Sequence, residues 1–248
     1  MHTRPFTVDY CYLLDGIFQM IVSHRHKLIF IKTLKTAGTS IEMAIANECG
    51  PADVVTPIFP AVQGHEPRNW RGWFAPWKEV HSATDLRKNL RECWQRKRMY
   101  NHIPARFARA RMPKDIWDSY LKVAVDRNPW DKTLSHYHMF RNADWHRHYD
   151  PELTLDGYID KGVYCHNAPF YCDVEGNVIV DRVLRYDQLD QELPALFKEL
   201  DIPYSGLPQA KAGIRKDRRS YHDVFDGKQA QFIQNAFALE IRLHGWEY

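Results

Sequence analysis

The fold is decided by residues 28–47, which read LIFIKTLKTAGTSIEMAIAN. The first four residues are a short apolar run bounded by polar neighbours, as in a buried strand. The stretch from Ile41 to Asn47 is rich in residues that favour a helix, and Gly50 and Pro51 then end it. The predicted order is therefore strand, loop, helix, with a loop of small and polar residues at positions 32–40.

The same order returns further along the chain. Residues 123–125 form a second apolar run, which leads through residues 126–129 into a helix predicted to start at Trp130. Asn128 is a suitable N-cap, and the proline after it is tolerated because the first helical turn needs no N–H donor there. Two such turns predict an α/β fold with a central parallel sheet flanked by helices.

The rest of the chain adds further elements and no internal repeat. Residues 178–184 read as an apolar strand, residues 193–200 as a helix and residues 228–243 as a closing amphipathic helix. A polar stretch from 64 to 112 holds twelve Lys or Arg against four Asp or Glu, with four tryptophans among them. Because 248 residues with 44% hydrophobic content can bury one sizeable core, we predict a single domain over residues 1–248, with an insertion around 64–112.

Composition excludes several classes of protein. The net charge of +3, from 34 basic and 31 acidic residues, is too balanced for a protein that coats nucleic acid or membrane over its whole surface. The five cysteines include no CxxC pair, so neither a disulfide framework nor a zinc ribbon is indicated. The apolar stretch from Cys11 to Val22 is interrupted by Asp15 and Gln19 and is too short to span a membrane, so a buried strand or turn is expected there. These features predict a cytoplasmic protein without a transmembrane segment or a nucleic-acid partner.

The loop at residues 32–40 has the character of an anion site. Between a strand and a helix, unpaired backbone N–H groups and the positive end of the helix dipole converge on one point. It is not a Walker A loop, because the order G-x-x-x-x-G-K-[ST] is absent and Lys35 comes before Gly38. The predicted ligand is phosphate-like but not ATP. Taken alone, the loop could equally use Thr39 and Ser40 as helix caps and Lys35 as a solvated surface charge.

The second strand-to-helix turn favours the anion interpretation. Arg127 stands at the end of the strand, and Ser135 lies about two turns into the helix that follows. An arginine is a planar cation with several donors and a serine offers a hydroxyl, so both can reach one phosphate.

Together these stretches resemble the PAPS-dependent sulfotransferases, in particular the carbohydrate sulfotransferases and their bacterial relatives; PAPS is 3′-phosphoadenosine 5′-phosphosulfate. That family carries K-[TS]-x-G-T-S in a strand-loop-helix and R-[ND]-P-[YW] with a serine eight positions after the arginine. The resemblance extends to residues 183–189, similar to the family's R-Y-E-x-L, and to residues 244–246, similar to its F-G-Y ending. It spans most of the chain and implies a P-loop-like sulfotransferase fold.

The resemblance implies a transfer reaction and the residues that serve it. The chain would move a sulfuryl group from PAPS to an acceptor hydroxyl and release PAP, without a metal. Lys35 is implied as the catalytic cation, because negative charge grows on the 5′-phosphate as the sulfur–oxygen bond breaks. The donor-binding residues implied are Lys35, Thr36, Ala37, Gly38, Thr39, Ser40, Arg127 and Ser135, with Arg219 and Tyr221 as further contacts.

Two residues differ from the family pattern, and one stretch has a second interpretation. Leu34 stands where the family usually has a proline before the lysine, and Asp187 stands where glutamate is commoner. The basic stretch at residues 215–221, which supplies Arg219 and Tyr221, could also be a solvated charged face.

The acceptor hydroxyl must lose a proton, and a histidine is a suitable base. His102 lies just before a predicted helix that leads toward the Arg127 strand, and related sulfotransferases carry a histidine in a similar position, where it acts as the base in some of them. His65, His81 and a carboxylate such as Glu66 are the alternatives.

Four further histidines raise the question of a metal site. Their spacing does not repeat a helical pair of ligands, and no carboxylate pattern completes a set of ligands. We therefore predict no metal and expect these side chains to be solvated: His136, His138, His146 and His148.

The Trp- and Arg-rich insertion indicates the acceptor. Aromatic faces suit apolar sugar surfaces and guanidinium groups suit acidic groups, which favours a carbohydrate or glycolipid, or another small molecule with a hydroxyl. The same residues could instead form a partner-binding face or ordinary core.

A non-enzymatic protein that binds polyanions or nucleotides is the first alternative. A nucleotide-dependent kinase is the second, although it would need Mg²⁺ ligands and a lysine after the glycine. The sequence does not fix the oligomeric state.

Overall fold

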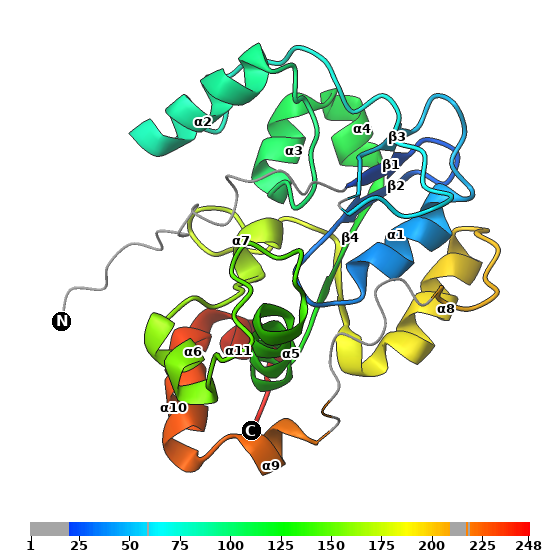
Figure 1. Ribbon diagram of the computed structural model, residues 1–248. Helices are drawn as coiled ribbons and strands as arrows, with labels where there is room; N and C mark the ends of the chain where they lie inside the picture. The colour runs from blue at the N-terminus through cyan, green and yellow to red at the C-terminus, as the bar shows by residue number, and fades with distance from the viewer. Residues whose placement is uncertain (1–19, 59, 209–216, 218) are drawn as a thin grey trace.

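The computed structural model describes residues 20–58, 60–208, 217 and 219–248 (Figure 1). The strands are β1 (Ile21–Ser23), β2 (Leu28–Ile31), β3 (Val54–Val55), β4 (Leu121–Asp126) and β5 (Arg182–Arg185). The helices before β5 are α1 (Gly38–Ala46), α2 (Ala83–Trp94), α3 (Ala105–Arg111), α4 (Lys114–Ser119), α5 (Pro129–Asn142), α6 (Leu155–Lys161) and α7 (Ala168–Tyr171). After β5 come the 3-10 helix η2 (Tyr186–Gln188), then α8 (Leu189–Glu199), α9 (Tyr221–Val224), α10 (Gly227–Ala236) and α11 (Ala238–His244).

These strands form one mixed sheet in the order β3-β1-β2-β4-β5. The predicted parallel part consists of β2, β4 and β5, with Ile31 opposite Ala124 and Asp126 opposite Arg185. The sequence did not indicate that β1 would pair with β2 and β3 in antiparallel fashion. The reason is the short connection between Ser23 and Leu28, because a tight turn can join only antiparallel neighbours.

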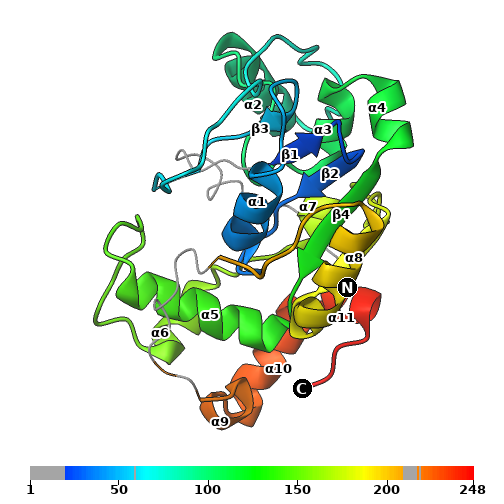
Figure 2. The same ribbon diagram turned by 90° about the vertical axis from the view of Figure 1, so that its right-hand side faces the viewer.

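Both faces of the sheet are buried, as expected for an α/β fold. Alternate residues of β2 point to opposite faces, so Ile29 and Ile31 belong to one core cluster and Leu28 and Phe30 to another. Helices α3 and α7 cover the first face, and α1 and α8 cover the second (Figures 1 and 2). The strands that lead into both predicted strand-loop-helix turns are therefore packed against a hydrophobic core on each face of the sheet.

A third cluster fixes the helix that follows β4. Trp130 of α5, Tyr158 of α6, and Ile233 and Phe237 from the C-terminal part are buried together. Figure 1 shows α5, α6, α10 and α11 gathered below the sheet. As predicted, Asn128 caps α5: its side chain accepts hydrogen bonds from the backbone N–H groups of Trp130 and Asp131.

Several predicted boundaries were wrong. The strand expected over residues 178–184 starts only at Arg182, because Val178 forms an isolated bridge with Cys172 instead. The closing helix predicted over residues 228–243 is divided at Phe237, which leaves helical geometry with φ −104° and ψ 24°. Of the apolar stretch from Cys11 to Val22, only residues 20–22 are described; all three are buried, and Ile21 and Val22 belong to β1. The remainder lies outside the described residues.

Within the described part of the chain, no helix is both long enough and apolar enough to cross a membrane. The four cysteines in that part are free thiols: Cys49, Cys93, Cys165 and Cys172. Cys11 lies outside the described residues.

Candidate functional site

The Lys32–Ser40 loop follows β2 at the carboxyl end of the parallel strands, and its last three residues form the start of α1. Lys35 and Ala37 both have left-handed backbone geometry, with φ of 60° and 55°. Such geometry is unfavourable for residues with a Cβ atom and tends to be kept where the local backbone shape has a function. The two left-handed residues turn the chain sharply before α1 begins.

This turn exposes a row of backbone donors. The N–H group of Ser40 donates to the carbonyl of Ala37 at 2.9 Å. For the N–H groups of residues 36–39, no acceptor is found among the described residues. Consecutive unpaired N–H groups at the positive end of a helix form an anion site, so the loop fits a phosphate or sulfate group.

A buried lysine forms the floor of the loop. Lys32 is 5% exposed, and its Nζ donates to Thr39 Oγ1 at 2.9 Å and to Glu42 Oε2 at 3.3 Å. A Cβ atom at Gly38 would lie 2.7 Å from Lys32 Cγ, so glycine is required there by close approach. The sequence did not single out Lys32, since nothing in its spacing separates it from a surface lysine.

The second predicted motif meets the first at this loop. Arg127 Nη1 donates to the Lys35 carbonyl at 2.9 Å, its Nε donates to Asp131 at 2.7 Å, and its guanidinium lies 4.1 Å from the centre of the Tyr186 ring. The other three guanidinium N–H groups make no hydrogen bond to a described residue. Ser135 is partly exposed and lies four residues after Asp131, on the same face of α5.

Asn167, which the sequence did not indicate, clamps the backbone of the loop. It is fully buried; its Oδ1 accepts from the N–H of Leu34 at 2.8 Å, and its Nδ2 donates to the Leu34 carbonyl at 3.1 Å and to Asp126 Oδ1 at 2.7 Å. A proline at position 34 would have no N–H to donate. The leucine at position 34 therefore gives the loop a second hydrogen bond to Asn167.

A buried ion cluster supports Asn167 in turn. Lys132 Nζ lies 2.9 Å from Asp126 Oδ1 and 2.8 Å from Glu240 Oε2, and all three side chains are buried. Burial alone would lower the pKa of Lys132, but the two carboxylates raise it above its ordinary value, so the ammonium stays charged. Glu240 also accepts from the backbone N–H groups of Asn167 and Ala168, which joins α5, α7 and α11 behind the loop.

The charge of Lys35 lowers the pKa of two histidines, His136 in α5 and His146 in the segment that follows α5. Burial first, and then the charge of Lys35, hold the pKa of His136 well below its ordinary value. Burial, His148 and Lys35 together lower the pKa of His146 to about 4.

We expected His136, His138, His146 and His148 to be solvated, and this was wrong for the first two. His136 and His138 are buried on different sides of α5: His136 packs on Phe140, with its Nδ1 2.8 Å from the Tyr158 hydroxyl, and His138 packs against Tyr137. Among the described residues, no group of three or more side chains has a metal-binding arrangement.

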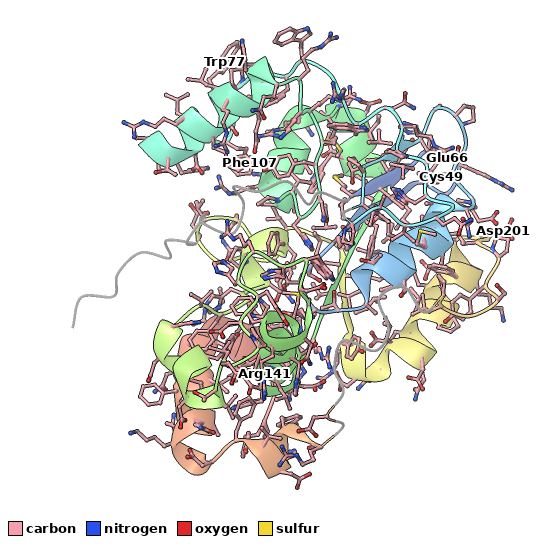
Figure 3. All side chains as sticks on the ribbon, viewed as in Figure 1. Cys49, Glu66, Trp77, Phe107, Arg141 and Asp201 are labelled. Carbon is pink, nitrogen blue, oxygen red and sulfur yellow. The ribbon has the colours of Figure 1, made fainter. Side chains whose placement is uncertain are left out.

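The predicted base lies directly against the loop. His102 Nδ1 is 2.9 Å from the Lys32 carbonyl, which can only accept, so Nδ1 carries the proton and the lone pair of the neutral ring is on Nε2. Of the alternatives, His65 is enclosed with its Nε2 3.7 Å from Glu42, and His81 is half exposed beside Glu79. Glu66, labelled in Figure 3, is exposed.

The two C-terminal candidates differ in position. Tyr221 stacks on Trp130 with 6.5 Å between ring centres, and its hydroxyl accepts from Asn128 at 3.4 Å, which places it at the start of α5 near Arg127. Arg219 is exposed and pairs with Asp217 at 2.7 Å. Residues 215, 216 and 218 of the same stretch lie outside the described residues.

The sheet and the loop define a P-loop-like α/β protein. No known family model matches the chain. It is 30% identical over 104 residues to an uncharacterized protein of Archaeoglobus fulgidus, a match that covers 41% of this chain and 84% of that protein. The chain therefore belongs to the same family as this archaeal protein, whose description names no activity.

Two solved structures resemble the chain at 13% sequence identity. A retinol dehydratase in complex with androsterone and the inactive cofactor PAP has a TM-score of 0.43, over 92% of this chain and 84% of its own. A sulfotransferase from Alicyclobacillus acidocaldarius has a TM-score of 0.35, over 90% and 96%.

Proposed function

We propose that the chain is a sulfotransferase that transfers a sulfuryl group from PAPS to an acceptor hydroxyl. The observation that carries this proposal is the 2.9 Å hydrogen bond from Arg127 to the Lys35 carbonyl. It joins two motifs that lie 92 residues apart in sequence, at one end of the parallel strands. The loop can bind one phosphate group, and the Arg127 guanidinium beside it can bind a second. This suits a donor such as PAPS, which carries phosphate at the 3′ and at the 5′ position of its ribose.

In this proposal the donor supplies an activated sulfuryl group, and the chain supplies position and charge. The N–H groups of residues 36–39 and the ammonium of Lys35 hold the 5′ end and stabilise the negative charge that grows there. One preorganised donor of this kind typically contributes about 3 to 4 kcal/mol to lowering the barrier. Arg127 and Ser135 hold the 3′-phosphate.

His102 is the proposed base. Its Nε2 has the lone pair that accepts the proton of the acceptor hydroxyl, while Nδ1–H stays bonded to the Lys32 carbonyl. That hydrogen bond also fixes the orientation of the ring beside the loop. A histidine is suited to this step because its pKa lies near the working pH.

The acceptor and the setting are parts of the same proposal. The aromatic and basic character of residues 64–112 supports a carbohydrate or glycolipid acceptor, and this insertion also supplies His102. We propose that residues 1–248 act as one sulfotransferase domain. Free thiols at all four described cysteines support a reducing, cytoplasmic setting.

Calorimetry with PAP and with ATP tests the donor site. The wild-type chain should bind PAP at about micromolar affinity and ATP much more weakly. Arg127→Ala should weaken PAP binding by about tenfold or more, because a charged hydrogen bond is lost. Arg182→Ala, which removes an exposed arginine paired with Glu199, is the matched control and should leave PAP binding unchanged. A preference for ATP, or no nucleotide binding, would overturn the proposal.

A further inference from the structure

Three tryptophans of the insertion are open to solvent. Trp73, Trp77 and Trp94 are 64%, 72% and 79% exposed, whereas Trp130 in the core is 1% exposed. An indole ring is among the largest apolar surfaces a side chain can offer, so three of them in water need an explanation.

These rings belong to one surface. Helix α2 carries Leu86, Leu90 and Trp94 at intervals of four residues, which places them along one line, and both leucines are exposed. We call these three residues, with Trp73 and Trp77, the aromatic surface.

The loop that carries Trp73 and Trp77 is tied alongside α2. Asn89 Nδ2 donates to the Pro76 carbonyl at 2.9 Å, and Cys93 Sγ donates to the Phe74 carbonyl at 3.3 Å. Figure 3 shows Trp77 beside α2 at the outer edge of the molecule. The exposed rings and leucines therefore gather around one helix at the periphery of the fold.

The charges around the aromatic surface are almost all positive. The two acids of α2, Asp85 and Glu92, are buried and pair inward with Arg106 at 2.9 Å and Arg111 at 2.7 Å. Their charges are thus neutralised inside the protein. Four exposed cations remain around the rings, and none has an ion pair among the described residues: Lys78, Arg87, Arg91 and Arg96.

We propose that the aromatic surface docks the protein on an anionic lipid bilayer. Tryptophan prefers the boundary between lipid and water, exposed leucines enter the acyl region, and arginine and lysine meet acidic headgroups. The leucines argue against a purely carbohydrate ligand, since they offer nothing to sugar hydroxyls. This inference rests on the exposure and charge of α2 and not on the proposed transferase activity. Where both hold, the glycolipid becomes the favoured acceptor within the proposed class.

Vesicle co-sedimentation with the full chain tests the proposal. The protein should pellet with vesicles of phosphatidylcholine and phosphatidylglycerol at low salt, and about tenfold less with pure phosphatidylcholine. The triple variant Trp73→Ala, Trp77→Ala, Trp94→Ala should reduce binding to the anionic vesicles by about tenfold. The double variant Arg87→Glu, Arg91→Glu should remove the preference for anionic lipid.

The matched control is Phe232→Ala, which truncates a 51% exposed aromatic ring on α10 and should leave vesicle binding unchanged. Circular dichroism should show all variants folded, because the substituted side chains are exposed. Absence of binding to anionic vesicles overturns the proposal, as does equal binding by wild type and the tryptophan variant. Sedimentation velocity supplies a further test: a dimer that only the tryptophan variant dissociates, without vesicle binding, would assign the surface to a second copy of the chain.

Discussion

The Lys32–Ser40 loop and the aromatic surface differ in where their polar side chains lie. Around the loop, charged and amide side chains are buried and held by several partners, as for Lys32 and Asn167. On the aromatic surface, the acidic side chains are buried, and the cations and aromatic rings are exposed to solvent. The first arrangement holds donors in a fixed geometry, and transfer chemistry requires such groups to be placed within about 0.5 Å. The second leaves side chains able to adapt to a partner without fixed shape.

The difference implies that substitutions in the loop should affect both turnover and folding. Left-handed geometry at Lys35 and Ala37 is costly, and the contacts of Asn167 and Arg127 with the loop backbone offset that cost. Substitutions on the aromatic surface should leave folding almost unchanged.

Lys35→Ala should have the largest effect. Removing a cation that stabilises charge in the transition state should lower turnover of PAPS by about a hundredfold to a thousandfold. Lys198→Ala, at an exposed position on α8, is the control and should leave turnover unchanged. Normal turnover of Lys35→Ala in a sulfate-transfer assay would remove Lys35 from the mechanism.

His102→Gln should lower turnover by about a hundredfold while PAP affinity stays the same, since general base catalysis is lost and donor contacts remain. The decline of turnover toward acidic pH that a histidine base causes should also disappear. If His102→Gln retains normal turnover over the whole pH range, the base is another group.

Asn167→Leu should lower the free energy of unfolding by about 3 kcal/mol, because the Leu34 N–H and the carboxylate of Asp126 lose a buried partner. Urea denaturation measures this, with the exposed Asn235→Leu as the control. Leu34→Pro, which removes the N–H donor, should be destabilising as well. Unchanged stability in both loop variants would mean that the clamp does not hold the loop.

The pH dependence of stability tests the buried side of the comparison. Burial, with Lys132, lowers the pKa of His166 to about 4, while the unfolded chain keeps the ordinary value. Below the unfolded pKa the unfolded state takes up a proton that the native state refuses, so this stabilisation is full at pH 7 and is lost as pH falls toward 4. Between pH 6.5 and 5 the free energy of unfolding should fall by about 2 kcal/mol from this group. His166→Gln should flatten the urea-measured slope, and an unaltered slope would contradict the assignment.

Trp94→Ala should have the smallest effect on folding. Its ring is 79% exposed, so the free energy of unfolding should change by about 0.5 kcal/mol or less. A loss several times larger in urea denaturation would show that the ring packs against the protein in solution.

Local sequence determined much of the architecture. The apolar runs at residues 28–31 and 123–125, and the N-cap at Asn128, predicted strands and a helix start that the structure confirms. Predictions failed where packing overrode the local pattern. Val178 is drawn into a bridge with Cys172, and Phe237 interrupts a helical pattern as its ring enters the core.

The sequence suggested which residues form the candidate site, but it did not show how they are brought together. Lys35 and Gly38 were marked because a loop between a strand and a helix exposes backbone N–H groups. Arg127 was marked because it stands at the end of the second predicted strand. Only the tertiary structure decided that Arg127 meets the Lys35 carbonyl and that Asn167, 133 residues away, clamps Leu34. Contacts between residues so far apart depend on strand order and helix packing, and those are set by burial of the whole core, which no local stretch encodes.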